Sequence, residues 1–144
     1  MQVESIDHLV LTVDDIELTV SFYQTLLGMQ RIDFGAGRVA VAFGSQKINL
    51  HLSGSEFEPK AGRVQPGSAD LCFIIDTPLD QAVAELCHAG VEVLEGPVER
   101  TGALGPIRSV YFRDPDGNLI ELSNYLPNQP LQHLQSLMAD TKTA

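Results

Sequence analysis

Apolar and polar positions follow two different periods along the chain, and the sequence passes through both periods twice. The stretch IDHLVLTV, from residue 6, alternates like a strand with one buried face, and residues 16–27 carry apolar side chains at helical spacing until Gly28. Three short segments rich in β-forming residues follow, namely MQRIDFG, RVAVAFG and QKINLHLSG. The first half is therefore predicted to fold as one strand, one helix and three strands.

The second half repeats this order. ADLCFIIDTP has the apolar spacing of the first strand, and a helix is expected from about Leu79 to Ala89. VEVLEGPVER, PIRSVYFR and NLIELSNY are predicted as three more strands, with a tight hairpin turn at DPDG between the last two. This internal repeat predicts an α+β fold in which two tandem βαβββ modules form a cupped, mixed β-sheet.

The boundaries follow from where the periodicity stops. Residues 53–68 are rich in Gly, Pro and Ser and have no regular pattern, so they are predicted to be a linker or a loop over the site. The modules are then residues 1–52 and 69–126. Residues 127–144 form a tail, in which LQHLQSLM is expected to make a short amphipathic helix.

Charge and composition narrow the class of partner. The formal net charge of -10 argues against binding to nucleic acid or to an anionic membrane surface. The sequence has no leader pattern and no apolar segment long enough to span a bilayer, so a cytoplasmic location is expected. Cys72 and Cys87 lie in apolar contexts without CxxC spacing, which predicts buried thiols in a reducing compartment.

Four residues able to bind a metal occupy related positions in the two halves. His8 and His51 alternate with the apolar residues of the first and fourth predicted strands, so both face away from the helix. Asp70 and Glu121 do the same in the second half. When the repeats are aligned, Asp70 stands at the position of His8, and Glu121 at that of His51.

Each of these side chains alone would be a solvated strand residue, but the set favours a cation. Neighbouring carboxylates repel one another unless a proton or a cation lies between them. Two imidazoles and two carboxylates without a thiolate suit Mn, Fe, Co, Ni or Zn in an open five- or six-coordinate site. The sequence therefore predicts that His8, His51, Asp70 and Glu121 bind a divalent metal ion.

Other residues on the same faces suggest a cavity for a small molecule. Ala40 and Ala42 are small and leave room for a ligand, and Asn49 lies beside His51 in the alternation. Tyr111 either orients a substrate or packs on a neighbouring strand. Arg100 opens the glycine-rich stretch RTGALGP, which either brings a guanidinium to an anionic substrate or is a plain connection. Asn49, Tyr111 and Arg100 are thus candidate substrate-binding residues.

Several motifs resemble a known superfamily. DHLVLTV, FYQTLLGM and SVYFRDPDGNLIELSNY are similar to the vicinal oxygen chelate superfamily, which contains glyoxalase I, fosfomycin-resistance proteins, extradiol dioxygenases and bleomycin-resistance proteins. The resemblance spans about Ser5 to Tyr125, and within it the chain resembles the glyoxalase domain-containing protein 5 subgroup. It implies paired βαβββ modules with metal ligands on the first and fourth strands. The chain departs from glyoxalase I, which typically has Glu in place of His51 and His in place of Asp70.

The resemblance and the residues together imply three functions. The favoured one is a metal-dependent lyase or isomerase of the glyoxalase type, acting on a small carbonyl or vicinal-oxygen compound through a metal-stabilised enediolate. Glu121 is then the catalytic base and Asp70 its partner. The alternatives are a non-haem iron dioxygenase using His8, His51 and Glu121, and a metal-free drug-binding protein. Because a single module leaves an open half-cup, a homodimer is expected.

Overall fold

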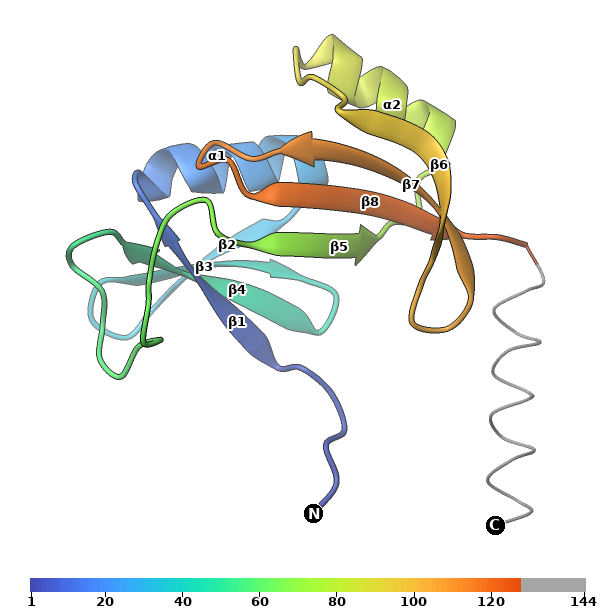
Figure 1. The fold of residues 1–144 in the computed structure, drawn as a ribbon. Helices are drawn as coiled ribbons and strands as arrows, with labels where there is room; N and C mark the ends of the chain where they lie inside the picture. The colour runs from blue at the N-terminus through green and yellow to red at the C-terminus, as the bar shows by residue number, and fades with distance from the viewer. Residues whose placement is uncertain (128–144) are drawn as a thin grey trace. The chain divides into compact units, whose positions relative to one another are not determined.

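The computed structural model of the chain describes residues 1–127 (Figure 1). The tail helix predicted at LQHLQSLM lies outside the described residues. In the first half the elements are β1 (His8–Val13), α1 (Ile16–Leu27), β2 (Gln30–Phe34), β3 (Arg38–Phe43) and β4 (Gln46–Leu52). In the second half they are β5 (Asp70–Ile74), α2 (Leu79–His88), β6 (Glu95–Thr101), β7 (Pro106–Arg113) and β8 (Leu119–Tyr125). The predicted α+β fold with two βαβββ modules is confirmed.

The strands form two four-stranded sheets with the same internal order. The first sheet has the order β1-β4-β3-β2, and the second has the order β5-β8-β7-β6. In the first sheet β1 runs parallel to β4, whereas β3 is antiparallel to both β4 and β2. Each sheet therefore places the first strand of its module beside the fourth.

The helix of the first module covers the apolar face of its sheet. α1 packs against β2, β3 and β4. The side chains that alternate toward it are almost completely buried, and they include Leu11, Val13, Val41, Ile48 and Leu50. The opposite face, called here the polar face of the first sheet, carries His8, Asn49, His51, Ala40 and Arg38. The apolar alternation thus decides which side chains remain available for chemistry.

The two helices begin in different ways. Asp15 caps α1 locally, because its carboxylate accepts a hydrogen bond from the Leu18 N–H at 2.9 Å, and Gly28 ends the helix in the left-handed region at φ 66°. α2 has no such local cap. Its Leu79 N–H instead donates to the side-chain oxygen of Asn124, on β8, at 2.8 Å. The second helix is therefore fixed by a residue far along the chain.

Contacts divide the chain into two compact units that do not coincide fully with the repeats. The first comprises Met1–Ala69 and Arg113–Leu119, and the second comprises Asp70–Phe112 and the described residues from Ile120 onward. The predicted hairpin turn between β7 and β8 is present, since the Asp114 N–H donates to the Asn118 carbonyl at 3.1 Å. It belongs to the first unit because Tyr23, on α1, donates its hydroxyl hydrogen to Asp114 at 2.7 Å.

The prediction of buried cysteines is wrong. Cys72 and Cys87 are both exposed. Cys72 shares the side of β5 that faces a cavity, and Cys87 lies one position beyond Leu86, the last residue of the buried stripe of α2. Apolar neighbours in sequence therefore did not place these thiols in the core. No helix within residues 1–127 has the length and apolarity needed to cross a membrane.

Candidate functional site

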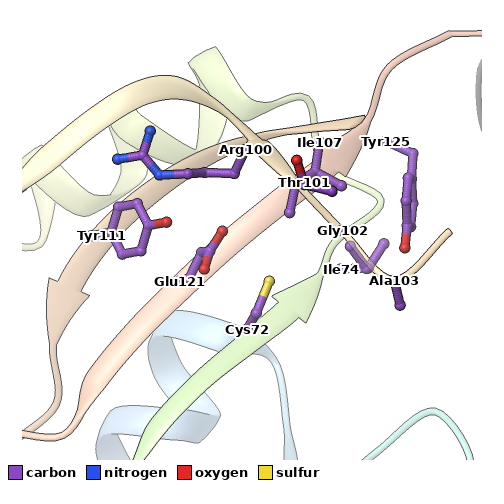
Figure 2. Close-up of a pocket in the computed structure, with 10 residues that line it drawn as sticks. All are labelled: Cys72, Ile74, Arg100, Thr101, Gly102, Ala103, Ile107, Tyr111, Glu121 and Tyr125. Carbon is purple, nitrogen blue, oxygen red and sulfur yellow. The ribbon is translucent and has the colours of Figure 1, made fainter. Parts of the chain in front are cut away.

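A cavity of about 420 Å³ opens within the second unit (Figure 2). Each of the four strands directs one polar side chain into this cavity, because alternate residues of a strand point to the same side of the sheet. This side is called here the polar face of the second sheet. In sheet order these side chains are Cys72 on β5, Glu121 on β8, Tyr111 on β7 and Arg100 on β6. The remaining lining residues are Ile74, Thr101, Gly102, Ala103, Ile107 and Tyr125. The cavity thus combines an acid, a phenol, a guanidinium and a thiol with apolar walls.

Three residues proposed from the sequence meet here. Glu121, Tyr111 and Arg100 all line the cavity, and the Glu121 carboxylate lies between the Tyr111 hydroxyl and the Cys72 thiol in Figure 2. The Arg100 guanidinium lies 5.6 Å from the centre of the Tyr111 ring and donates to Glu95 at 2.8 Å. That ion pair orients the guanidinium next to the ring.

The surroundings of Tyr111 and Cys72 favour the neutral form of each side chain. Desolvation raises the pKa of the Tyr111 hydroxyl, and the hydrogen bond with Arg100 offsets only part of that shift. Desolvation within the cavity likewise raises the pKa of the Cys72 thiol. Tyr111 is therefore a hydrogen-bond donor at neutral pH, and Cys72 is a thiol with little nucleophilic thiolate.

The hydroxyl groups of Ser123 and Ser109 hold the Glu121 carboxylate in place. Ser123, two residues further along β8, donates to a Glu121 carboxylate oxygen at 3.3 Å. The same hydroxyl contacts the Ser109 hydroxyl at 2.7 Å and the Cys72 sulfur at 3.3 Å. The carboxylate is thus positioned by its own strand and by both neighbouring strands.

The loop between β6 and β7 forms one wall of the cavity. Gly102 donates its N–H to the Gly105 carbonyl at 2.8 Å, which closes the hairpin. Tyr125 accepts a hydrogen bond from the Leu104 N–H at 3.2 Å and so ties the loop to the end of β8. A Cβ on Gly102 would lie 2.9 Å from an Ile107 methyl group, so the close packing of this wall requires glycine.

A second polar cluster lies in the first unit. Asn49 and His51, on β4, are only 7% and 6% exposed. The Asn49 side-chain oxygen and the His51 Nδ1 are buried without a hydrogen-bond partner. Phe57 packs edge-on against the His51 ring at 5.5 Å, and the Arg38 guanidinium lies 4.4 Å from the centre of the Phe57 ring. Part of the aperiodic segment 53–68 therefore folds back over this face.

Charge around His51 disfavours its protonated form. Burial is the main cause that lowers the pKa of His51, and the positive charge of Arg38 acts in the same direction. Glu56 opposes the shift, but it accepts hydrogen bonds from the Gly54 N–H and lies 3.7 Å from the Lys60 ammonium. His51 is therefore a neutral imidazole near neutral pH.

His8 lies on the same face as His51 but far along the strands. It is exposed, and its Nδ1 lies 2.8 Å from an Asp7 carboxylate oxygen. In the parallel ladder His8 pairs with Lys47, four residues before His51, so about 13 Å separates the two positions along the strand direction. Side chains on parallel strands lean the same way, whereas ligands of one metal ion lie about 2 Å from it. The register therefore disfavours a metal ion shared by His8 and His51 of the same chain.

Asp70 begins β5 on the side that carries Cys72, and it is exposed. Within residues 1–127 no group of three or more His, Cys, Asp or Glu side chains is close enough together to hold a metal ion. The four-ligand set stays a prediction. The sequence pattern missed Phe57, Glu95 and Tyr125, because each acts through a contact that periodicity does not encode.

Comparisons with known proteins place these features in a family. A family model described as the Glyoxalase/Bleomycin resistance protein/Dioxygenase superfamily matches residues 5–122. "Virulence protein STM3117" of Salmonella typhimurium is 58% identical over 126 residues, which is 88% of each chain. "Glyoxalase domain-containing protein RDO1" of Mycosarcoma maydis is 58% identical over 125 residues, 87% of this chain and 70% of that protein. The structure of integron cassette protein VCH_CASS1 of V. cholerae is 60% identical with a TM-score of 0.86, covering 88% and 98% of the chains.

More distant matches carry varied names. Metallothiol transferase FosB of Shouchella clausii is 26% identical over 141 residues, covering 96% of this chain and 92% of that protein. Lactoylglutathione lyase from Agrobacterium tumefaciens is 23% identical with a TM-score of 0.66, covering 85% and 95% of the chains. FosX from Listeria monocytogenes, solved with Mn(II) and sulfate, is 22% identical with a TM-score of 0.63, covering 92% and 99%. At these identities the two structures show similarity of fold alone.

Proposed function

Because the chain belongs to the Glyoxalase/Bleomycin resistance protein/Dioxygenase superfamily, we propose that it is a metal-dependent lyase or isomerase acting on a small carbonyl or vicinal-oxygen compound. One observation carries the proposal. The Glu121 carboxylate faces a cavity, supported by the Ser123 hydroxyl, with the Tyr111 hydroxyl beside it. A supported carboxylate next to a protonated donor is an arrangement suited to proton transfer.

Each cavity residue has a defined role in this proposal. Glu121 removes a proton from one substrate carbon and returns it to the neighbouring carbon. Tyr111, held in its protonated form, donates a hydrogen bond to a substrate oxygen. Arg100, oriented by Glu95, binds an anionic substituent. The apolar walls exclude water from the carbon that loses its proton.

The donor chemistry of the chain fits a first-row divalent cation. The contact between His8 Nδ1 and Asp7 leaves Nε2 available, and a carboxylate commonly orients a metal-binding imidazole in this way. We propose His8, Asp70 and Glu121 as ligands for Mn, Fe, Co, Ni or Zn. His51 is left out of this proposed set because the strand register separates it from His8 by four residues. When bound, the ion supplies Lewis acidity toward a substrate carbonyl.

Deuterium exchange followed by NMR tests this function. Metal-loaded protein is incubated in deuterated water with a panel of α-hydroxycarbonyl and dicarbonyl compounds, and elemental analysis records the bound metal. Glu121→Gln is expected to lower the exchange rate by about 10²-fold or more, whereas Glu99→Gln, which removes an exposed carboxylate from β6, leaves it unchanged. Equal exchange by wild type and Glu121→Gln would contradict the proposal. Oxygen uptake with catechols by iron-loaded protein would favour the dioxygenase instead.

A homodimer is part of the proposal. The polar faces of both sheets carry exposed apolar side chains, with Val10 46% and Ile32 38% exposed in the first and Ile74 53% exposed in the second. Such side chains support a partner surface. Light scattering at micromolar concentration is expected to give the mass of two chains, and a monomer alone would contradict it. Mixing His8→Ala with Glu121→Ala chains restores some exchange activity only if two chains contribute to one site.

A further inference from the structure

We propose that the cavity of the second unit takes a linear carboxylate of about six to eight carbons, with vicinal oxygens next to the carboxylate and an unbranched alkyl tail. This inference rests on the proposed function and names its substrate class. The volume of the cavity is the first observation. At about 420 Å³ it lies in the range of about 300–1,000 Å³ typical of sites for drug-sized ligands, so a compound as small as pyruvate would leave much of it unfilled.

The cavity has a polar end and an apolar end. Figure 2 shows the Arg100 guanidinium, Tyr111 and Glu121 together at one end, with Cys72 and Thr101 further along. The opposite end is lined by apolar groups, which come from Ile74, Ala103, Ile107 and the ring of Tyr125. A ligand that spans the cavity therefore meets charged and polar groups at one end and hydrocarbon at the other.

Tyr125 belongs to the apolar end although it carries a hydroxyl group. That hydroxyl accepts a hydrogen bond from the Leu104 N–H at 3.2 Å, so it is bound to the loop while the ring lines the cavity. Ile74 lies on the cavity side of β5 and is 53% exposed. Apolar surface left in water at the wall of a cavity favours a ligand whose hydrocarbon covers it. This end is therefore suited to an alkyl tail.

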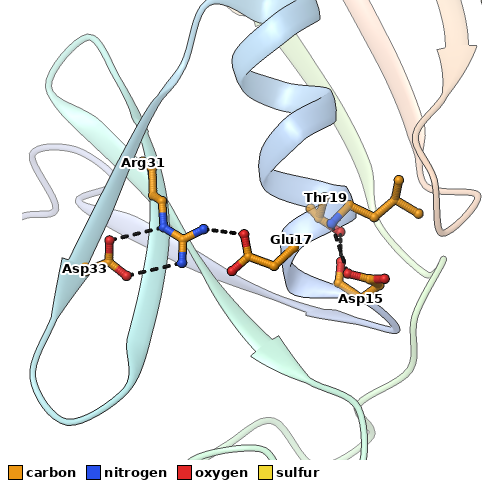
Figure 3. A network of polar contacts seen from close by, with 6 residues as sticks. Asp15, Glu17, Thr19, Arg31 and Asp33 are labelled. Carbon is orange, nitrogen blue, oxygen red and sulfur yellow. Dashed lines mark hydrogen bonds and ion pairs between the residues drawn. The ribbon is translucent and has the colours of Figure 1, made fainter.

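Arg100 provides for a carboxylate at the polar end. Within residues 1–127 it forms one ion pair, with Glu95 at 2.8 Å. Arg31, in the first unit, shows how many carboxylates a guanidinium of this chain can hold: it contacts Glu17 at 2.6 Å and Asp33 at 3.1 Å, and Figure 3 shows both directed at it. Arg100 has one such partner, so it can hold a second carboxylate, which the ligand supplies.

The vicinal oxygens follow from Tyr111 and Glu121. The Tyr111 ring lies 5.6 Å from the Arg100 guanidinium, so a carboxylate bound by Arg100 brings the next carbon, C2, beside the Tyr111 hydroxyl. Tyr111 donates a hydrogen bond to a carbonyl oxygen on C2, and Glu121 takes the proton from C3. The electrons of that C–H bond form a C2–C3 double bond, and the carbonyl oxygen becomes an enolate oxygen. When C3 carries a hydroxyl, return of the proton to C2 and transfer of the hydroxyl proton to the enolate oxygen complete an isomerisation.

The strands set the length of the tail. The reacting carbon C3 lies at Glu121, next to Cys72, and the apolar end begins two residues further along β5, at Ile74. Two residues of a strand cover about 7 Å. An extended chain advances roughly 1.2 Å per bond, so the tail has room for about three to five carbons beyond C3.

Isothermal titration calorimetry of the full chain with 2-oxobutyrate and 2-oxooctanoate tests the tail. Both compounds have the same carboxylate and the same C2 carbonyl, so the ratio of their affinities reports the tail alone. The wild type is expected to bind 2-oxooctanoate about tenfold or more tightly than 2-oxobutyrate. The ratio is measured in the presence of Zn²⁺ and again with a chelator, and it is expected in both because the tail lies away from the proposed ligands.

Two isoleucines give a matched pair of variants. Ile74→Thr keeps a β-branched residue in the strand but puts a hydroxyl at the apolar end, and it is expected to lower the affinity ratio about threefold. Ile32→Thr makes the same change at an exposed isoleucine of the first sheet, which is 38% exposed, and it is expected to keep the wild-type ratio.

Two further variants separate the ends of the cavity. Ala103→Leu narrows the apolar end, so it should weaken binding of 2-oxooctanoate about threefold and leave that of 2-oxobutyrate unchanged. Arg100→Gln should weaken both compounds about tenfold and leave their ratio unchanged.

Three outcomes would overturn the inference: no saturable binding of 2-oxooctanoate, equal affinity of the wild type for both compounds, or the same ratio in Ile74→Thr as in the wild type. A second chain covering the apolar end would produce the second outcome. The proposed reaction fails separately. A preference for the long tail without deuterium exchange would refute only the reaction, whereas exchange without that preference would refute only the substrate class.

Discussion

Two buried polar clusters in the first unit are built in opposite ways. Around Asp114, one carboxylate oxygen accepts from the backbone N–H groups of Asp116 and Asn118, and the other accepts from Tyr23 and the Asn118 amide. In the Asn49–His51 pair, by contrast, one polar atom of each side chain is buried without a partner. The Asp114 carboxylate itself is fully hydrogen-bonded, although Oδ2 of the neighbouring Asp116 is also buried without a partner. The contrast between the Asp114 carboxylate and the Asn49–His51 pair supports a structural role for the first and a functional role for the second.

Removal of the Asp114 carboxylate should have the largest effect on the free energy of unfolding. Asp114→Ala leaves several buried donors without an acceptor, because four hydrogen bonds converge on this carboxylate. The free energy of unfolding is expected to fall by about 3 kcal/mol or more. Urea unfolding measures it. Asp80→Ala, which removes an exposed carboxylate paired with Arg108, should change stability by about 0.5 kcal/mol at most, and a similar loss in both variants would contradict the comparison.

A smaller loss is expected when one donor of the same cluster is removed. Tyr23→Phe deletes the hydroxyl that bonds Asp114 at 2.7 Å but keeps the ring packed in the core. Stability should fall by about 2 kcal/mol, typical of a hydrogen bond to a charged group. Thermal and urea unfolding report this change. Unchanged stability of Tyr23→Phe would contradict the contribution assigned to this hydrogen bond.

A change of pH is expected to have a still smaller effect on the free energy of unfolding. Because the pKa of His51 is lowered in the folded chain, the unfolded chain binds a proton at this site at a higher pH than the folded chain. Acidification from about pH 8 to pH 5 therefore destabilises the wild type through His51, and His51→Gln removes that contribution. Arg38 and Lys60 strengthen the shift, while Glu56 weakens it. The free energy of unfolding of His51→Gln, relative to that of the wild type, should rise as pH falls. A difference that stays constant with pH would refute the lowered pKa of His51.

Much of the fold and part of the site could be predicted from the sequence. Alternation and helical spacing indicated both βαβββ modules, and the family match confirms the resemblance found in the motifs. Glu121 and Tyr111 could be placed on one face because strand alternation fixes the direction of a side chain relative to its neighbours. Arg100 was predicted to bind substrate because it opens the glycine-rich stretch RTGALGP. The first two residues of that stretch, Arg100 and Thr101, belong to β6.

The remaining features depend on contacts that no local pattern encodes. Phe57 contacts the His51 ring although it lies in a segment without regular periodicity. The Asn124 side chain accepts a hydrogen bond from the first residue of α2, 45 residues earlier in the sequence. The alignment of the repeats treated His8 and His51 as a pair, but the β1–β4 register separates them by four residues. Strand register is set by pairing and turns, which periodicity alone does not fix.

The most direct test of this comparison uses two buried asparagines with different surroundings. The Asn118 amide donates to Asp114 and accepts from the Ala69 N–H, whereas the Asn49 oxygen has no partner. Urea unfolding of the full chain is measured for Asn118→Leu and Asn49→Leu. We expect Asn118→Leu to lower the free energy of unfolding by about 2 kcal/mol or more, and Asn49→Leu to match or exceed the wild type by up to about 1 kcal/mol. Equal destabilisation by both substitutions would contradict the account.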